Sequence, residues 1–85
     1  AVVIGAGPVG TLHAMMFKAA GATTILADVA PVRLEVARKA GIEHIVNVKH
    51  QSLRDAVMDL SDGMGADVSV DAVGNQLAAT LEVTA

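Results

Sequence analysis

The chain has 85 residues, of which 53% are hydrophobic, one is aromatic and none is cysteine, and its formal net charge is −3. A negative chain without a basic run is a poor partner for nucleic acid, and no apolar stretch approaches the roughly 20 residues of a membrane helix. Without cysteine there is neither a disulfide nor a thiolate metal site. Because no leader-like segment precedes the first strand, we expect a soluble, cytoplasmic protein that binds neither nucleic acid nor a membrane.

The first predicted strand occupies residues 2–4, a β-branched run typical of a buried strand. The glycine-rich stretch after it leads into a predicted helix whose apolar residues recur at helical spacing. We expect this stripe to face the sheet, and on it His13 has a packing role. The members of the stripe are Val9, Leu12, His13, Met16, Phe17 and Ala20.

A second strand is predicted at residues 24–27, and a second helix follows it. That helix begins with Pro31, because a missing N–H costs little in the first turn, and it stops at Gly41, a good left-handed terminator. The residues predicted to face inwards are Leu34, Ala37 and Ala40.

A third strand is predicted at residues 44–48, and the helix after it begins with a capping-box pattern in which Ser52 caps and Asp55 answers. The apolar residues that follow are Ala56, Val57 and Leu60, and "DGMG" at 62–65 ends the helix. The last predicted strand occupies residues 68–73, and Asn75 is a candidate cap for a fourth helix. That helix would run through Leu77 and Leu81.

Strand and helix thus alternate four times with short connections, which predicts an α/β fold with a Rossmann-type, doubly wound parallel sheet. The expected strand order is 3-2-1-4, and a complete fold of this kind has six strands. The first residue already lies at a strand, so we expect residues 1–85 to form a partial domain of this kind within a longer protein.

Between the first strand and the first helix stands "GAGPVG", a G-x-G-x-x-G motif. Gly5 permits the tight turn, Gly7 lets a pyrophosphate approach the backbone, and Gly10 lets helix and strand pack closely. The N–H groups at the start of the helix favour an anion. Pro8 cannot donate a hydrogen bond, which leaves Val9 and Gly10 as the better donors. A purely structural strand–helix junction is the alternative.

Asp28 ends the second strand 23 residues after Gly5, close to the roughly 20-residue offset of an acid that binds the ribose hydroxyls of a dinucleotide. A carboxylate there repels a 2′-phosphate, so NAD is the expected cofactor. Arg33 lies either over the adenine and ribose or simply in solvent. Strands 1 and 4 are predicted neighbours, so the crevice at their carboxyl ends should also border the cofactor. The residues of strand 4 expected there are Ala72, Val73 and Gly74.

Other chemistry-bearing side chains form no convincing site. His13, His44 and His50 have no repeated ligand spacing, and Asp55 and Asp59 are expected on a solvated helix face together with Asp62. No nucleophile–base pair is evident either. The chain is therefore expected to bind a cofactor without catalytic or metal-binding residues of its own.

The whole chain resembles the nucleotide-binding core of zinc-type medium-chain dehydrogenases, in the branch of the polyol (sorbitol) and threonine dehydrogenases. The resemblance rests on "VVIGAGPVG", "HAMMFKAAGA", "ILADVAPVRLEVARKAGIEHIVN" and "DGMGADVSVDAVGN". It implies a ribose acid at Asp28, an adenosine-side arginine at Arg33 and a ribose loop at residues 72–74. The pyrophosphate loop that it implies consists of Gly5, Gly7, Pro8, Val9 and Gly10. Ala30 departs from the pattern, since a Ser-like cap is expected before Pro31.

The resemblance further implies a homo-oligomeric parent enzyme that oxidises a secondary alcohol or polyol by hydride transfer to NAD, with a catalytic zinc. The zinc ligands and the contacts with the small alcohol belong to a domain that these residues lack, so the chain alone is expected to be inactive. Two alternatives remain open. One is a zinc-free, NADP-dependent quinone or enoyl reductase of the same superfamily, and the other is a non-catalytic nucleotide-binding module.

Overall fold

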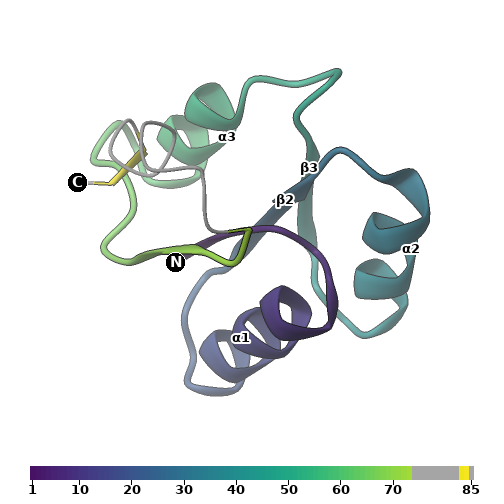
Figure 1. The fold of residues 1–85 in the computed structure, drawn as a ribbon. Coiled ribbons are helices and arrows are strands. Elements are labelled where there is room, and N and C mark those ends of the chain that lie inside the picture. The colour runs from purple at the N-terminus through teal and green to yellow at the C-terminus, as the bar shows by residue number, and fades with distance from the viewer. Residues whose placement is uncertain (74–82, 85) are drawn as a thin grey trace.

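The computed structural model describes residues 1–73, 83 and 84. They form one four-stranded sheet with helices on both faces (Figure 1). The elements follow in the order β1 (Val2–Ile4), α1 (Pro8–Ala19), β2 (Ile25–Asp28), α2 (Pro31–Lys39), β3 (His44–Asn47), α3 (Leu53–Leu60) and β4 (Ser69–Asp71). The fourth helix expected at Asn75, Leu77 and Leu81 lies outside the described residues, as does Gly74.

The sheet is parallel and has the order β3-β2-β1-β4, which confirms the predicted topology. Val2 pairs with Ile25 on one side and with Ser69 on the other. The predicted strands differ from the observed ones only at their ends, where β2 starts later and includes Asp28 and β4 is shorter on both sides. Because all strands run the same way, their carboxyl ends share one edge of the sheet.

Each face of the sheet carries its own apolar cluster. On one face Val3 and Leu26 pack with Ala14 of α1 and with Leu34 of α2. On the other face Val57 of α3 packs against the alternate residues of β1 and β2. Helices α1 and α2 therefore cover one face and α3 covers the other, as the ribbon shows (Figure 1). This is the doubly wound arrangement that the sequence predicts.

The stripe predicted for the sheet-facing side of α1 is wrong. Val9, Leu12 and Met16 are 61%, 57% and 63% exposed, Ala20 is exposed, and His13 is only half-buried with Nδ1 2.8 Å from the carbonyl oxygen of Val9. The buried residues of α1 are instead Gly10 and Ala14, and of the predicted stripe Phe17 packs against the same cluster.

The physical reason is the contact between α1 and the turn before it. A Cβ atom at Gly10 would lie 1.7 Å from the carbonyl oxygen of Gly5, so the backbones touch there. That contact fixes the rotation of the helix about its axis, and the residues one and two turns after Gly10 then face the sheet. The large apolar side chains are consequently left on the outside.

The helix ends follow local sequence more closely. Helix α2 starts at Pro31, and Leu34 and Ala37 are buried as predicted, whereas Ala40 is exposed because it caps the carboxyl end of the helix. The Ser52 hydroxyl oxygen accepts a hydrogen bond from the Asp55 amide at 3.2 Å, which confirms the predicted cap of α3. Within the described residues no helix is long and apolar enough to cross a bilayer.

Candidate functional site

The glycine turn joins the carboxyl end of β1 to the start of α1. Gly5 has a φ of +111°, a conformation that side chains rarely tolerate, and its amide donates to the carbonyl oxygen of Ala27 at 2.7 Å. Gly10 is needed for the close backbone contact with Gly5 described above. Both glycines are thus explained by the protein's own shape.

Gly7 is different, because no protein atom lies within 4 Å of a Cβ built at this position. It is the N-cap residue of α1, its backbone is extended with φ −70° and ψ −176°, and no side chain caps the helix. Nothing in the described structure therefore excludes a side chain at Gly7. Because Gly7 has no side chain, a ligand can come close to its backbone.

The first turn of α1 presents backbone donors at the same place. Pro8 is the first helical residue and has no N–H, and Pro8 and Val9 are both exposed. The amides of Val9 and Gly10 lie in the first turn, where a helix has no carbonyl partners for them. The positive end of the helix dipole adds to their attraction for an anion.

Asp28 lies at the end of β2, with a side chain only 8% exposed, and its carboxylate is bound by backbone amides on both oxygens. Oδ2 accepts from Ala6 at 2.7 Å, within the glycine turn. Oδ1 accepts from Val29 at 2.6 Å and from Ala30 at 3.0 Å. The two Oδ1 contacts hold the loop that leads from β2 into α2, whose N-cap residue Ala30 has no capping side chain.

The carboxylate of Asp28 is stabilised in its charged form. Burial raises its pKa, but the three backbone hydrogen bonds and the nearby Arg33 guanidinium together outweigh burial and hold the pKa below the ordinary value of 3.8. The group is therefore ionised at neutral pH. Arg33 Nη1 lies 3.9 Å from Asp28 Oδ2, and its side chain is 63% exposed, so this ion pair is solvated.

A cavity of about 580 Å³ opens at the carboxyl edge of the sheet, and Asp28 and Arg33 line it. Its walls come from the ends of several strands and from the loop before α3. The lining residues contributed by the strand ends are Ile4, Gly5, Ala27, Val48 and Val73. A groove of about 550 Å³ between α1 and α2 adjoins the same turn, and Gly7, Pro8 and Arg33 line it. Of the expected site residues, Gly5, Asp28 and Val73 line the cavity, Gly7 and Pro8 line the groove, and Arg33 lines both.

The end of β4 reaches the same edge. The Ala72 amide donates to the carbonyl oxygen of Ile4 at 2.9 Å, and a Cβ atom at Gly5 would lie 2.9 Å from Val73 Cγ2. Ala72 and Val73 are thus brought beside the glycine turn, as expected. Gly74, the third residue of this group, lies outside the described residues.

Residues after β3 were missed by the sequence reasoning. Val48, Gln51, Ser52, Leu53 and Arg54 line the cavity beside Asp28, and Val83 joins them from near the end of the chain. The sequence held a signal for Val48 alone, because it directly follows a parallel strand and such strands place their carboxyl ends at one edge.

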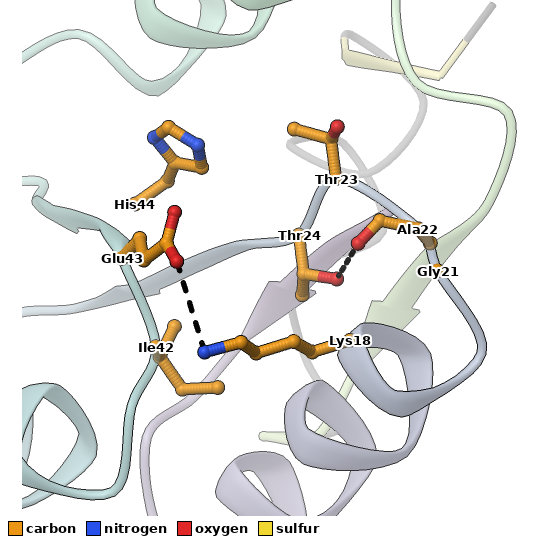
Figure 2. A pocket seen from close by; sticks show the side chains of 8 residues that line it. All are labelled: Lys18, Gly21, Ala22, Thr23, Thr24, Ile42, Glu43 and His44. Carbon is orange, nitrogen blue, oxygen red and sulfur yellow. Dashed lines mark hydrogen bonds and ion pairs between the residues drawn. The ribbon is translucent and has the colours of Figure 1, made fainter.

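A smaller pocket, of about 200 Å³, lies at the amino ends of the strands (Figure 2). Lys18 reaches across it toward Glu43, with Nζ 3.8 Å from the carboxylate oxygen, and also donates to the carbonyl oxygen of Gly41. Thr24 hydrogen-bonds the carbonyl oxygen of Ala22 within the same pocket. The contacts of Lys18 join α1 to the loop before β3, and none of the residues expected to bind a cofactor lines this pocket.

No metal site is formed by the part of the chain that the structure describes, since no three His, Asp or Glu side chains there come together suitably. Asp55, Asp59 and Asp62 are all exposed, in agreement with a solvated face. Backbone amides take three of the acceptor positions of Asp28.

A model of the family described as zinc-binding dehydrogenase matches residues 8–85, which is nearly the whole chain. The chain belongs to this family. Among curated members, L-threonine 3-dehydrogenase of Sinorhizobium fredii is 38% identical over 74 residues, covering 86% of the chain and 21% of that enzyme. Sorbitol dehydrogenase of Bacillus subtilis is 38% identical over 77 residues, covering 89% and 22%.

Solved structures of an alcohol dehydrogenase and of a quinone oxidoreductase share the fold. An alcohol dehydrogenase from Thermus sp. ATN1 superimposes with a TM-score of 0.90 at 31% identity, covering 98% of the chain and 25% of that protein. Escherichia coli quinone oxidoreductase, solved with NADPH, gives a TM-score of 0.82 at 24% identity, with coverages of 99% and 26%. The chain thus spans about a fifth of the length of its curated relatives.

Zinc, which the family name implies, does not fit the described residues of this chain. A catalytic zinc takes three nitrogen, sulfur or oxygen ligands from the protein. The chain has no cysteine, and its described His, Asp and Glu residues make no cluster. The described residues therefore offer no zinc site of their own.

Proposed function

We propose that this chain is the dinucleotide-binding part of an oxidoreductase that transfers a hydride from a secondary alcohol or polyol to NAD. The observation that carries the proposal is the link between Asp28 and Ala6, which places an ionised carboxylate directly beside the uncapped start of α1. A dinucleotide needs these two features together, because its ribose hydroxyls lie next to its diphosphate.

The diphosphate would lie against Gly7 and accept hydrogen bonds from the amides of Val9 and Gly10. Support comes from the open space at Gly7, since a Cβ atom would fill the position that a phosphate oxygen needs. The groove along Pro8, which the first turn of α1 borders, gives the ligand access. The family's shared fold, in which α1 starts at the carboxyl edge of the sheet, is consistent with this placement.

The adenosine ribose would bind at Asp28. A carboxylate offers about four acceptor positions, and backbone amides use three of them here, two on Oδ1 and one on Oδ2. One position is left on Oδ2, and because Asp28 lines the cavity we expect this oxygen to accept from a ribose hydroxyl there. Its negative charge opposes a phosphate on the 2′ oxygen, so NAD should bind more tightly than NADP.

The chain's own residues bind and orient the cofactor, and we assign no catalytic residue among them. When bound, zinc in this family would polarise the alcohol oxygen for oxidation. We place the zinc ligands and the contacts with the alcohol in the four-fifths of the relatives' length that the chain does not match. By itself the chain should therefore bind NAD without oxidising an alcohol.

An NADP-dependent reductase is the competing function. The fold is shared with a quinone oxidoreductase solved with NADPH, and two arginines, Arg33 and Arg54, line the cavity beside Asp28. The buried, ionised acid favours NAD over this alternative.

Titration calorimetry of the chain with NAD and with NADP tests the proposal. We expect binding of NAD and at least about tenfold weaker binding of NADP, the size of one lost charge-assisted hydrogen bond. Tighter binding of NADP would support the reductase. No binding of either would refute both.

A further inference from the structure

Arg54 is a cation in an unfavourable place. It is the second residue of α3, at the positive end of the helix dipole, where acidic residues are stabilising and basic ones are not. Its side chain is exposed, and within the described residues it takes part in none of the ion pairs. Local helix stability therefore gives no reason for an arginine at this position.

The place of Arg54 in the cavity lining offers a reason for its charge. Arg54 lines the hollow that Asp28 and Arg33 also line, and it comes from the first turn of α3, whereas Arg33 comes from the first turn of α2. Arg33 likewise lies in the first turn of its helix, with no acidic residue there to balance it. Two guanidinium groups and one carboxylate thus surround the place where, on the proposed function, the ribose binds.

We propose that Arg54 is a second specificity-determining residue of the cofactor site, forming with Arg33 a cationic rim that would hold a 2′-phosphate if Asp28 did not repel it. The inference rests on the proposed function, because it needs the ribose at Asp28. Guanidinium groups suit this role, since they bind phosphate through two parallel hydrogen bonds. The exclusion of NADP then depends on one charge, that of Asp28.

The charge balance supports this role. Arg33 Nη1 lies 3.9 Å from Asp28 Oδ2, so the carboxylate partly neutralises the positive charge of Arg33. When Asp28 is neutral, Arg33 is released, and both cations become available to an incoming phosphate. An arginine that served only solubility would make no distinction between ligands with and without a 2′-phosphate.

The test uses two small ligands, adenosine 5′-phosphate and adenosine 2′,5′-bisphosphate, which differ only in the 2′-phosphate. We compare the ratio of the affinity for the bisphosphate to the affinity for the monophosphate. In Asp28→Asn this ratio should be about tenfold or more higher than in the unsubstituted chain. In the double variant Asp28→Asn/Arg54→Gln, the increase in the logarithm of this affinity ratio should be smaller by at least about half. The matched control is Arg38→Gln in the same background, because Arg38 lies in the last turn of α2 and pairs with Glu35.

The outcomes separate the two hypotheses. If Arg54→Gln and Arg38→Gln leave the ratio equally unchanged, Arg54 has no part in specificity. If Asp28→Asn fails to raise the ratio, the rim as a whole is absent. Should the unsubstituted chain bind neither ligand nor NAD, the proposed function itself fails.

A second measurement does not depend on the folding of Asp28→Asn. With Asp28 intact, Arg54→Gln should lower the weak affinity for the bisphosphate about threefold to tenfold relative to the monophosphate, and added salt should reduce this difference. Equal effects on both ligands would overturn the role of Arg54.

Discussion

The Oδ2 atom of Asp28 accepts a hydrogen bond from the amide of Ala6 at 2.7 Å, and this contact ties the end of β2 to the turn that follows β1. The two residues are 22 positions apart in sequence, so only the parallel pairing of the strands brings them together. One side chain thereby shapes the glycine turn and, on the proposed function, also supplies the acceptor for a ribose. Structure and proposed binding share the same atoms.

Replacing Asp28 by alanine should therefore affect both properties. We expect the free energy of unfolding to fall by about 1–3 kcal/mol, because the part-buried Ala6 amide loses its acceptor, and NAD binding to weaken by a similar amount. Urea unfolding and calorimetric titration measure the two losses. An unchanged affinity for NAD in a folded variant would remove Asp28 from the site.

The lowered pKa of Asp28 predicts how its contribution depends on pH. The carboxylate is more acidic in the folded chain than in the unfolded one, so its stabilising effect is complete above the unfolded value near 3.8 and is lost as the pH falls through the lower, folded value. Asp28→Asn should thus lose less stability than the unsubstituted chain between about pH 5 and pH 2. Parallel pH profiles of the two proteins would contradict the lowered pKa.

Gly7→Ala should separate binding from folding. A Cβ atom there meets no protein atom and the backbone φ is −70°, so we expect the free energy of unfolding to change by less than about 1 kcal/mol. NAD should nevertheless bind at least about tenfold more weakly, because the methyl group occupies the space proposed for a phosphate.

Gly10→Ala is the matched comparison. Its Cβ atom would lie 1.7 Å from a backbone oxygen, so this variant should lose more than about 2 kcal/mol of stability. If Gly7→Ala bound NAD as tightly as the unsubstituted chain, the diphosphate would have to lie elsewhere.

The rotation of α1 can be tested by a pair of substitutions. Leu12→Ser should change stability by less than about 0.5 kcal/mol, because Leu12 is exposed, whereas Ala14→Val should cost about 1–3 kcal/mol, because Ala14 is fully buried against the sheet. Thermal unfolding of both variants decides between this rotation and the one that apolar spacing predicts. The opposite ranking would favour the latter.

Strand order and the position of Asp28 were predictable because they follow from chain-wide regularities, the alternation of strand and helix and the right-handed crossover. The Ser52 cap was predictable from three neighbouring residues. The buried face of α1 was not, because a single backbone contact at Gly10 outweighs the spacing of large side chains such as Leu12.

The residues that line the cavity could also be predicted only in part from the sequence. Glycine spacing indicates Gly5 and Gly7, because the turn has a sequence signature. Arg54 has none, since its place depends on the path of the loop between β3 and α3. Residues that reach a site through such loops become visible only when the strand ends are placed together.

The most direct test of the central claim is an amide chemical-shift map of the isotope-labelled chain during titration with NAD. We predict that the largest changes occur at the amides of Ala6, Gly7, Val9 and Gly10, with little change at Gly21 on the opposite edge of the sheet. Changes centred on the pocket around Gly21, or none at all at saturating NAD, would contradict the account.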